Sequence, residues 1–184
     1  EGYIPVNHAR KLTVKSSMKK SERRNSFTLE QLKIIFSSSF FRSGKQWATE
    51  YTDSVNPRHY AYYWVPLIGL WTGARANEIC QLHVSDIINL DGIALFNVTE
   101  EDSEDESGAT RKRLKTENAI RTIPVHLELA KAGFLSYVDS VRSSGNKQLF
   151  PALSEDSRGY FSDSLSRWFS RYLQEVGAKT ARRS

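Results

Sequence analysis

The sequence WVPLIGLWTGARANEICQLHVSDI, residues 64–87, contains an arginine at a position where the surrounding pattern calls for an apolar residue. Gly73 interrupts the apolar helical run before it, and the pattern predicts a new helix from about Ala74 onward. Arg75 is therefore expected in the first turn of that helix. This stretch predicts two consecutive helices joined by a turn, with an unusual charge directly after the turn.

A helical wheel predicts that Arg75 lies on the inward face of this second helix. At 100° per residue, Ile79 and Leu82 fall within roughly 40° of Arg75. Asn77 and Gln81 point the other way. An arginine on a buried face is costly unless it is paired or binds an anion.

Two partners are available to Arg75 in this prediction. Glu78 lies one turn further on, about 60° away, where a carboxylate can pair with the guanidinium. The first turn of a helix also presents unpaired N–H groups at the positive end of the helix dipole, where phosphates bind. A phosphate-binding arginine held by Glu78 and a purely structural ion pair between the two residues are both open on these residues alone.

A second segment, LKTENAIRTIPVH at residues 114–126, decides between them. The combination of TGAR with Glu78, Leu82 and Asp86-Ile87, followed by a Lys-Thr and an Arg-Thr-Ile-Pro strand, resembles the tyrosine recombinases, the phage integrase family. The resemblance covers about residues 26–184. It favours the phosphate-binding interpretation of the arginine.

Length and composition predict one main domain. The chain has 184 residues, 39% of them hydrophobic, enough for a single core. Its one cysteine, Cys80, excludes a disulfide framework and fits a reducing, cytoplasmic setting. No apolar run approaches the roughly 20 residues that span a membrane, and residues 1–11 lack the apolar core of a signal peptide. We therefore expect a cytoplasmic protein without membrane contact.

The basic residues lie mainly at the two ends of the chain. The net charge is +5, yet residues 1–24 alone carry seven Lys/Arg against two Glu, and residues 179–184 add three more cations. Residues 1–25 are therefore expected to be a basic linker or the end of a preceding DNA-binding domain. They fit either a strap along a polyanion or a solvated, disordered tail.

The signals along residues 26–184 predict helices around a small antiparallel sheet. Thr28 and Gln31 form a capping box for a helix to about residue 40, followed by a loop that contains Gly44. Asn56-Pro57 start a helix that ends near residue 71. The aromatic residues along it are expected to pack in the core. These are Tyr60, Tyr62, Tyr63, Trp64 and Trp71.

The second half predicts the sheet and two further helices. Residues 87–98 form a hairpin around Asp91-Gly92, with residues 93–98 apolar on both faces and so expected to be covered on both sides. Residues 120–125 form a third strand that Pro124 confines to an edge or a strand end. Amphipathic helices are expected at residues 127–141 and at residues 162–176. The fold class is mainly α with a small antiparallel β-sheet (α+β). The resemblance adds a recombinase catalytic domain, incomplete at its C-terminus.

An acidic run separates the two parts of the predicted sheet. Residues 100–106 contain six carboxylates, and residues 111–115, shortly after them, contain four Lys or Arg side chains. A mobile, solvated loop is the better interpretation than a metal site, since the run has no calcium-loop spacing. A further hypothesis is that this run mimics DNA and shields the basic strand. No metal or other cofactor is expected.

The resemblance implies a reaction and roles for individual residues. In this family a tyrosine attacks DNA to give a 3′-phosphotyrosine link, and the strand is cut and resealed without metal, cofactor or ATP. Arg75 matches the first phosphate-clamping arginine, and Glu78 matches the acidic residue that orients it. Lys115 matches the general acid on the leaving 5′ oxygen, although Lys112 is easily mistaken for it and an ordinary exposed lysine is the alternative.

Other candidate residues have less specific roles. The basic residues Arg111, Lys112, Arg113 and Arg121 are predicted to contact DNA backbone phosphates, with a solvated strand face as the alternative. His59, His83 and His126 have no metal-ligand spacing and are expected to be surface or hydrogen-bonded residues.

The chain departs from the family pattern at its end. The second box of the family, a His-x-x-Arg pair and then the nucleophilic tyrosine, is expected to follow the last residue present. Tyr160 and Tyr172 precede that box and are not expected to be nucleophiles. The expected parent protein recombines or integrates phage, prophage or mobile-element DNA as a tetramer on double-stranded DNA, whereas the present chain is expected to be monomeric and inactive. A non-catalytic DNA-binding or regulatory protein is the main alternative, and a helical scaffold without a nucleic-acid role is a weaker one.

Overall fold

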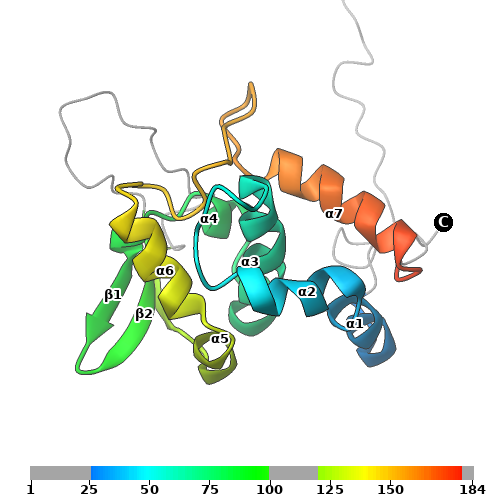
Figure 1. The fold of residues 1–184 in the computed structure, drawn as a ribbon, viewed down its shortest axis with the longest axis horizontal. Coiled ribbons are helices and arrows are strands. Elements are labelled where there is room, and N and C mark those ends of the chain that lie inside the picture. The colour runs from blue at the N-terminus through cyan, green and yellow to red at the C-terminus, as the bar shows by residue number, and fades with distance from the viewer. Residues whose placement is uncertain (1–25, 100–119, 180–184) are drawn as a thin grey trace, which may run out of the picture.

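The computed structural model describes residues 26–99 and 120–179, which form helices around a three-stranded antiparallel sheet. This confirms the predicted α+β class. Figure 1 shows the β1–β2 hairpin at one end of the molecule, α1 and α7 at the other, and α3 between them. The elements in chain order are α1 (Leu29–Phe36), α2 (Ser39–Trp47), α3 (Pro57–Thr72), α4 (Ala76–Cys80), the 3₁₀ helix η3 (Val84–Asp86), β1 (Ile87–Leu90), β2 (Ile93–Val98), β3 (Arg121–Pro124), α5 (Leu127–Lys131), α6 (Phe134–Ser143) and α7 (Asp163–Glu175).

The first predicted helix is two helices. The capping box at its start is confirmed, because the Thr28 N–H donates to Gln31 Oε1 at 2.9 Å and the Gln31 N–H donates to Thr28 Oγ1 at 3.2 Å. The helix ends at Phe36, however, and α2 then continues through Gly44, which was expected in a loop. Only glycine fits at this position of α2, because an added Cβ would lie 2.2 Å from the Tyr63 ring.

Helix α3 forms the centre of the core, as its aromatic spacing predicts. Asn56 caps its start by accepting the Arg58 N–H at 3.1 Å. Tyr60, Tyr62, Tyr63 and Trp64 are all buried. Trp71, in contrast, is 42% exposed, so its prediction as a core residue is wrong. Trp71 lies in the last turn of α3, where the helix has already passed beyond the core.

The sheet confirms the hairpin and the edge position of the third strand. Asp91 and Gly92 both have positive φ, 50° and 82°, as a tight hairpin turn requires. Strand β2 is central and pairs antiparallel with β1 and β3, with Phe96 opposite Ile123. Phe96 is buried, but Ile93 at the start of β2 is 57% exposed, so the prediction that this strand is covered on both sides is wrong at that end. The hairpin extends there beyond the helices.

The predicted helix at residues 127–141 is also divided. Helix α5 ends at Lys131 and α6 begins at Phe134, because Gly133 adopts a left-handed conformation with φ 89°. An added Cβ on Gly133 would lie 2.3 Å from Thr49 Cγ2, so the chain passes closely over the segment that follows α2.

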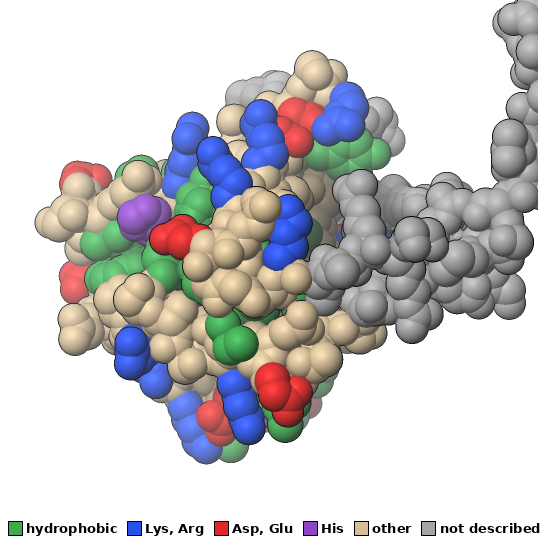
Figure 2. Space-filling model, turned by 90° about the vertical axis from the view of Figure 1, so that its right-hand side faces the viewer, with side chains coloured by type: hydrophobic (Ala, Val, Ile, Leu, Met, Phe, Trp, Pro, Cys, Tyr) green, Lys and Arg blue, Asp and Glu red, His purple; other side chains and the backbone are tan. Residues whose placement is uncertain are grey.

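Helix α7 confirms the last prediction within about one residue at each end. It runs from Asp163 to Glu175 and is followed by Gly177, which has the left-handed φ of 72° typical of a helix C-terminus. Figure 2 shows the face that carries α1 and α7, on which basic and acidic side chains are interspersed. In the described part of the chain no helix combines the length and the apolar character that crossing a membrane requires.

Candidate functional site

Arg75 lies immediately before α4, not inside it. It is the N-cap residue, with extended φ and ψ of −69° and 143°, and the helix begins at Ala76. The helical wheel therefore does not apply to it, and its predicted position on the inward face is wrong: the side chain is 56% exposed. Ile79 and Leu82 are buried, as predicted.

The predicted outward direction of Asn77 and Gln81 is also wrong. Gln81 is only 4% exposed. Asn77 Oδ1 accepts the backbone N–H of Phe161 at 2.9 Å and that of Ser162 at 3.3 Å. Helix α4 is short and the segment that leads into α7 covers this side of it, so both faces of α4 contact the protein.

Glu78 holds two arginines from different parts of the chain. Its carboxylate accepts the Arg75 backbone N–H at 3.0 Å and the Arg75 Nη1 donor at 2.8 Å. It also accepts a hydrogen bond from Nη2 of Arg121, in β3, at 2.8 Å. We call these three residues the Glu78 cluster. Glu78 itself is only 3% exposed, whereas the side chains of Arg75 and Arg121 are 56% and 35% exposed.

The electrostatics of the Glu78 cluster favour the ionised carboxylate. Burial by itself raises the pKa of Glu78, but the hydrogen bonds from Arg121 and from the backbone and side chain of Arg75 outweigh it and lower the pKa below its ordinary value. Two guanidinium groups around one carboxylate leave a net charge of +1. Each guanidinium has five N–H donors in a planar fork, a geometry that suits phosphate oxygens.

The pairing of Arg121 with Glu78 was missed at the sequence level, where Arg121 was assigned only to DNA backbone contact. The two residues are 43 positions apart, beyond the range of helical-wheel arguments. The alternation of buried and exposed residues along β3 does indicate that Arg121 needs a partner. Arg121 and Ile123 are half-buried, whereas Thr122 and Pro124 are exposed, so Arg121 shares a face with an apolar residue. An arginine on that face requires a carboxylate or an anion.

The remaining basic candidates cannot be placed relative to the cluster. Lys115, Arg111, Lys112 and Arg113 lie outside the described residues, as does the acidic run at residues 100–106. Their predicted roles remain predictions.

Asp86, part of the motif that carries the resemblance, has a structural task. Its carboxylate accepts the His83 backbone N–H at 2.7 Å and so caps the short helix η3 that leads into β1. Asp86 is 6% exposed. It fixes the path from α4 to the sheet, and thus the position of Glu78 relative to the strands.

The two tyrosines that sequence reasoning set aside differ in environment. Tyr172 is 6% exposed and its hydroxyl donates to the Ile35 carbonyl at 2.9 Å and bonds Ser38 Oγ. Burial raises the pKa of Tyr172, which disfavours the phenolate. Tyr160 is 44% exposed and lies in the loop before α7. Cys80 is a buried free cysteine, and burial raises the pKa of its thiol. Within residues 26–99 and 120–179, no group of three or more His, Cys, Asp or Glu could hold a metal ion.

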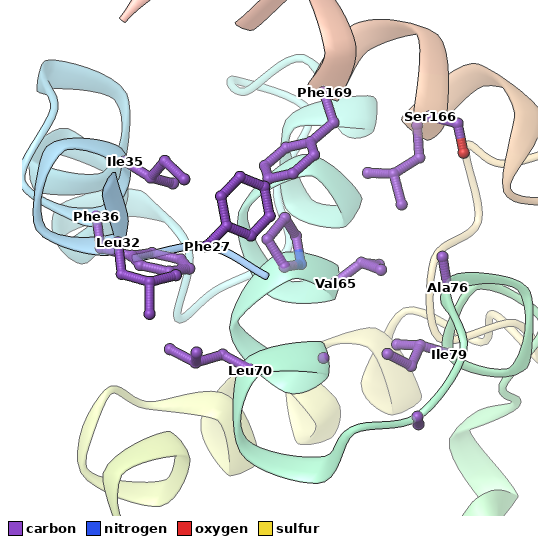
Figure 3. Close-up of a pocket in the computed structure, with 14 residues that line it drawn as sticks. Phe27, Leu32, Ile35, Phe36, Val65, Leu70, Ala76, Ile79, Ser166 and Phe169 are labelled. Carbon is purple, nitrogen blue, oxygen red and sulfur yellow. The ribbon is translucent and has the colours of Figure 1, made fainter. Parts of the chain in front are cut away.

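A hydrophobic cavity of about 320 Å³ lies on the other side of α4, between α1, α3 and α7. Figure 3 shows Ile79 and Ala76 from α4 lining it opposite Phe27 and Leu32, with Phe169 from α7 above. Among the described residues, none that lines this cavity is charged. The charged side chains at α4 therefore lie on the side of Glu78, and the side that faces the cavity is apolar.

Comparison of the chain with protein-family models, curated proteins and solved structures finds no match.

Proposed function

We propose that Arg75 and Arg121 bind a phosphate of double-stranded DNA, as part of a protein that cuts and rejoins DNA in the manner of the tyrosine recombinases. The observation that carries this proposal is the Glu78 cluster, in which one buried carboxylate holds two partly exposed guanidinium groups. The cluster presents a net positive charge and planar donors at the surface, which is what a phosphodiester needs.

A purely structural role explains only half of the cluster. Arg121 and Glu78 already tie β3 to α4. Arg75 adds a second cation from the N-cap of α4, and its side chain is more than half exposed, so it contributes little to packing. A second arginine in this position is therefore better explained by a ligand with negative charge.

The roles in this proposal follow from the geometry and from the resemblance. Arg75 and Arg121 stabilise the charge on the non-bridging oxygens, and Glu78 positions both of them. Lys115 protonates the leaving 5′ oxygen. The proposal assigns no nucleophile to these 184 residues, and Tyr172 is an unsuitable one because it is buried and hydrogen-bonded. Strand cleavage, tetramer formation on DNA and a cytoplasmic location are proposed for the parent protein.

Salt-dependent binding to a labelled duplex tests the phosphate contacts. We expect Arg75→Ala and Arg121→Ala each to weaken binding and to reduce the slope of log K against log salt by about one. Arg142→Ala is the matched control, since Arg142 is also an exposed arginine paired with an aspartate, on α6. An unchanged salt slope in both Arg75→Ala and Arg121→Ala contradicts the proposal.

A nicked suicide substrate tests the assignment of the nucleophile. Such a substrate traps a covalent protein–DNA link if a tyrosine attacks it. We expect weak binding but no covalent adduct with this chain, detected by denaturing gel electrophoresis. A trapped adduct that disappears in Tyr160→Phe or Tyr172→Phe would show that this chain supplies its own nucleophile.

A further inference from the structure

A second cleft, about 620 Å³ in volume, lies between α2, α3 and α5. We call it the Trp71 cleft. Its apolar wall includes Trp71 and Leu70, and its polar lining includes Lys45, Thr49, Glu128 and Lys131. It shares Leu70 and Phe36 with the hydrophobic cavity of Figure 3 but differs from it in having charged groups. Its size is within the range of small-ligand sites.

Trp71 is held in place although it is 42% exposed. Its ring stacks on His126, with ring centres 4.0 Å apart and planes 11° from parallel. His126 is itself fixed as the N-cap of α5, where its Nδ1 accepts the Glu128 N–H at 3.2 Å. His126 does not line the cleft, so it supports the indole while Trp71 forms part of the wall. A fixed, exposed aromatic ring loses little entropy when a ligand stacks on it.

The floor of the Trp71 cleft is rigid. Gly44 allows α2 to pack directly on Tyr63, and Gly133 allows the turn between α5 and α6 to pack on Thr49. Tyr63, Thr49 and Gly133 all line the cleft. Both close approaches leave no room for a side chain, so the shape of the cleft depends on glycine at positions 44 and 133.

The charges of the cleft favour an anionic ligand with a polar edge. Lys131 pairs with Glu128 at 2.9 Å, whereas Lys45 makes no ion pair with another residue in the described ranges. The cleft thus carries one cation in excess. Thr49, Glu128 and Lys131 supply hydrogen-bond donors and acceptors beside the aromatic wall.

The Trp71 cleft and the Glu78 cluster are joined by two short chain segments. Trp71 precedes Arg75 by four residues and His126 follows Arg121 by five. The Cα atoms of Trp71 and Arg75 are therefore at most about 14 Å apart. At one end of the two segments Trp71 stacks on His126. At the other end Arg75 and Arg121 both bind Glu78. A ligand that carries a flat ring and phosphates in one chain fits this arrangement.

We propose that the Trp71 cleft binds an unpaired nucleobase of a DNA strand, stacked on Trp71, with a neighbouring phosphate close to Lys45. Bases within a duplex are stacked on each other, so the base must come from a single-stranded or opened region. The continuation of the strand to Arg75 and Arg121 rests on the function proposed above, whereas the binding of the base does not.

The experiment compares a fluorescent thymidine oligomer with an oligomer of the same length and charge that has an abasic backbone. Base stacking on an aromatic side chain is worth roughly 5- to 150-fold in affinity per base. We expect the 184-residue chain to bind the thymidine oligomer more tightly by about that factor. We expect Trp71→Ala and Trp71→Leu to abolish this preference and Trp71→Phe to retain most of it.

Two further variants separate stacking from charge. Leu127→Ala is the matched apolar control, because Leu127 follows His126, is 62% exposed and does not line the cleft; it should keep the preference. Lys45→Gln should weaken binding of both oligomers and leave their ratio unchanged. Thermal unfolding identifies any variant that does not fold, and the comparison of the two oligomers with the unaltered chain requires no variant.

The outcomes are distinct from those of the duplex experiment. Equal affinity of the unaltered chain for both oligomers, or a preference that persists in folded Trp71→Ala and Trp71→Leu, overturns the proposal. Loss of the preference in Trp71→Ala, combined with no effect of either Arg75→Ala or Arg121→Ala on duplex binding, supports the cleft and contradicts the phosphate site. The reverse result contradicts the cleft alone.

Discussion

Two ion-pair clusters in the described part of the chain differ in the burial of their carboxylates and in the sequence distance between their members. In the Glu78 cluster the carboxylate is buried, and its two arginines come from the N-cap of α4 and from β3, 46 residues apart. In the second cluster, which we call the Arg158 cluster, all four residues lie between positions 156 and 167, and its arginines are about 70% exposed. They are Asp156, Arg158, Asp163 and Arg167.

The difference shows that Glu78 helps to hold the fold together, whereas the ion pairs of the Arg158 cluster form on a surface that is already folded. A buried carboxylate needs its partners, because it has no water to replace them. An exposed ion pair exchanges its partner for water at little cost. Glu78 therefore depends on its arginine partners, and the cluster places a net positive charge beside α4 in this chain. The Arg158 cluster shapes a surface loop and leaves the core unaffected.

The largest expected effect is that of Glu78→Ala. This change removes three hydrogen bonds that tie α4 to its own N-cap and to β3, and we expect a loss of about 2–3 kcal/mol in the free energy of unfolding. Arg75 and Arg121 are partly exposed and regain water, which keeps the loss below that of a fully buried pair. Urea unfolding measures it. Asp163→Ala, the matched change in the Arg158 cluster, should have a much smaller effect.

The charge-dependent part of that loss should appear as a pH dependence. The pKa of Glu78 is lowered in the folded protein, so the stabilisation is present above its ordinary value of 4.5 and is lost as pH falls through the lower folded pKa. We expect the stability difference between the unaltered protein and Glu78→Gln to be constant near neutral pH and to shrink below about pH 4.5. A difference that grows on acidification would contradict the assignment. Urea unfolding across this range measures it.

Asn77→Ala probes the connection between the two clusters. Asn77 on α4 accepts the backbone N–H groups of Phe161 and Ser162, which directly precede Asp163. Loss of both hydrogen bonds should cost about 1–2 kcal/mol in the free energy of unfolding. Asn77→Asp keeps the acceptor oxygen and should retain most of the stability. Equal losses in the two variants would show that the amide contributes by another route.

Arg158→Ala should have the smallest effect. Arg158 is 69% exposed, and water replaces its contacts with Asp156 and Asp163. We expect its unfolding midpoint to equal that of the unaltered protein within experimental error. A clear loss of stability would remove the distinction between the clusters.

The elements were predictable wherever a local rule determines the backbone. The Thr28 and Gln31 capping box, the Asn56 cap, the Asp91-Gly92 turn and the end of α7 all depend on neighbouring residues, and all are confirmed. The helical position of Gly44 and the break between α5 and α6 at Gly133 were not predicted, because the contacts that require glycine at these two positions are with Tyr63 and Thr49, which lie far from them in sequence.

The site was predictable in its residues but not in its geometry. The sequence identified Arg75 and Glu78 as a pair, and the structure shows the pair at 2.8 Å. The inward direction of Arg75 was wrong, because a helical wheel holds only inside a helix and Arg75 is the residue before it. The alternation of β3 indicates that Arg121 needs an anionic partner, but only the fold shows that this partner is Glu78, 43 positions away.

The N-cap position of Arg75 gives the site a property that a mid-helix arginine would lack. Glu78 is attached to Arg75 twice, once through the backbone N–H and once through the side chain. When the guanidinium swings away to an arriving anion, the backbone bond and the contact with Arg121 still hold the carboxylate. The Arg75 side chain can therefore exchange Glu78 for an anion while Glu78 keeps its other hydrogen bonds. Binding of an anion by Arg75 requires no movement of α4.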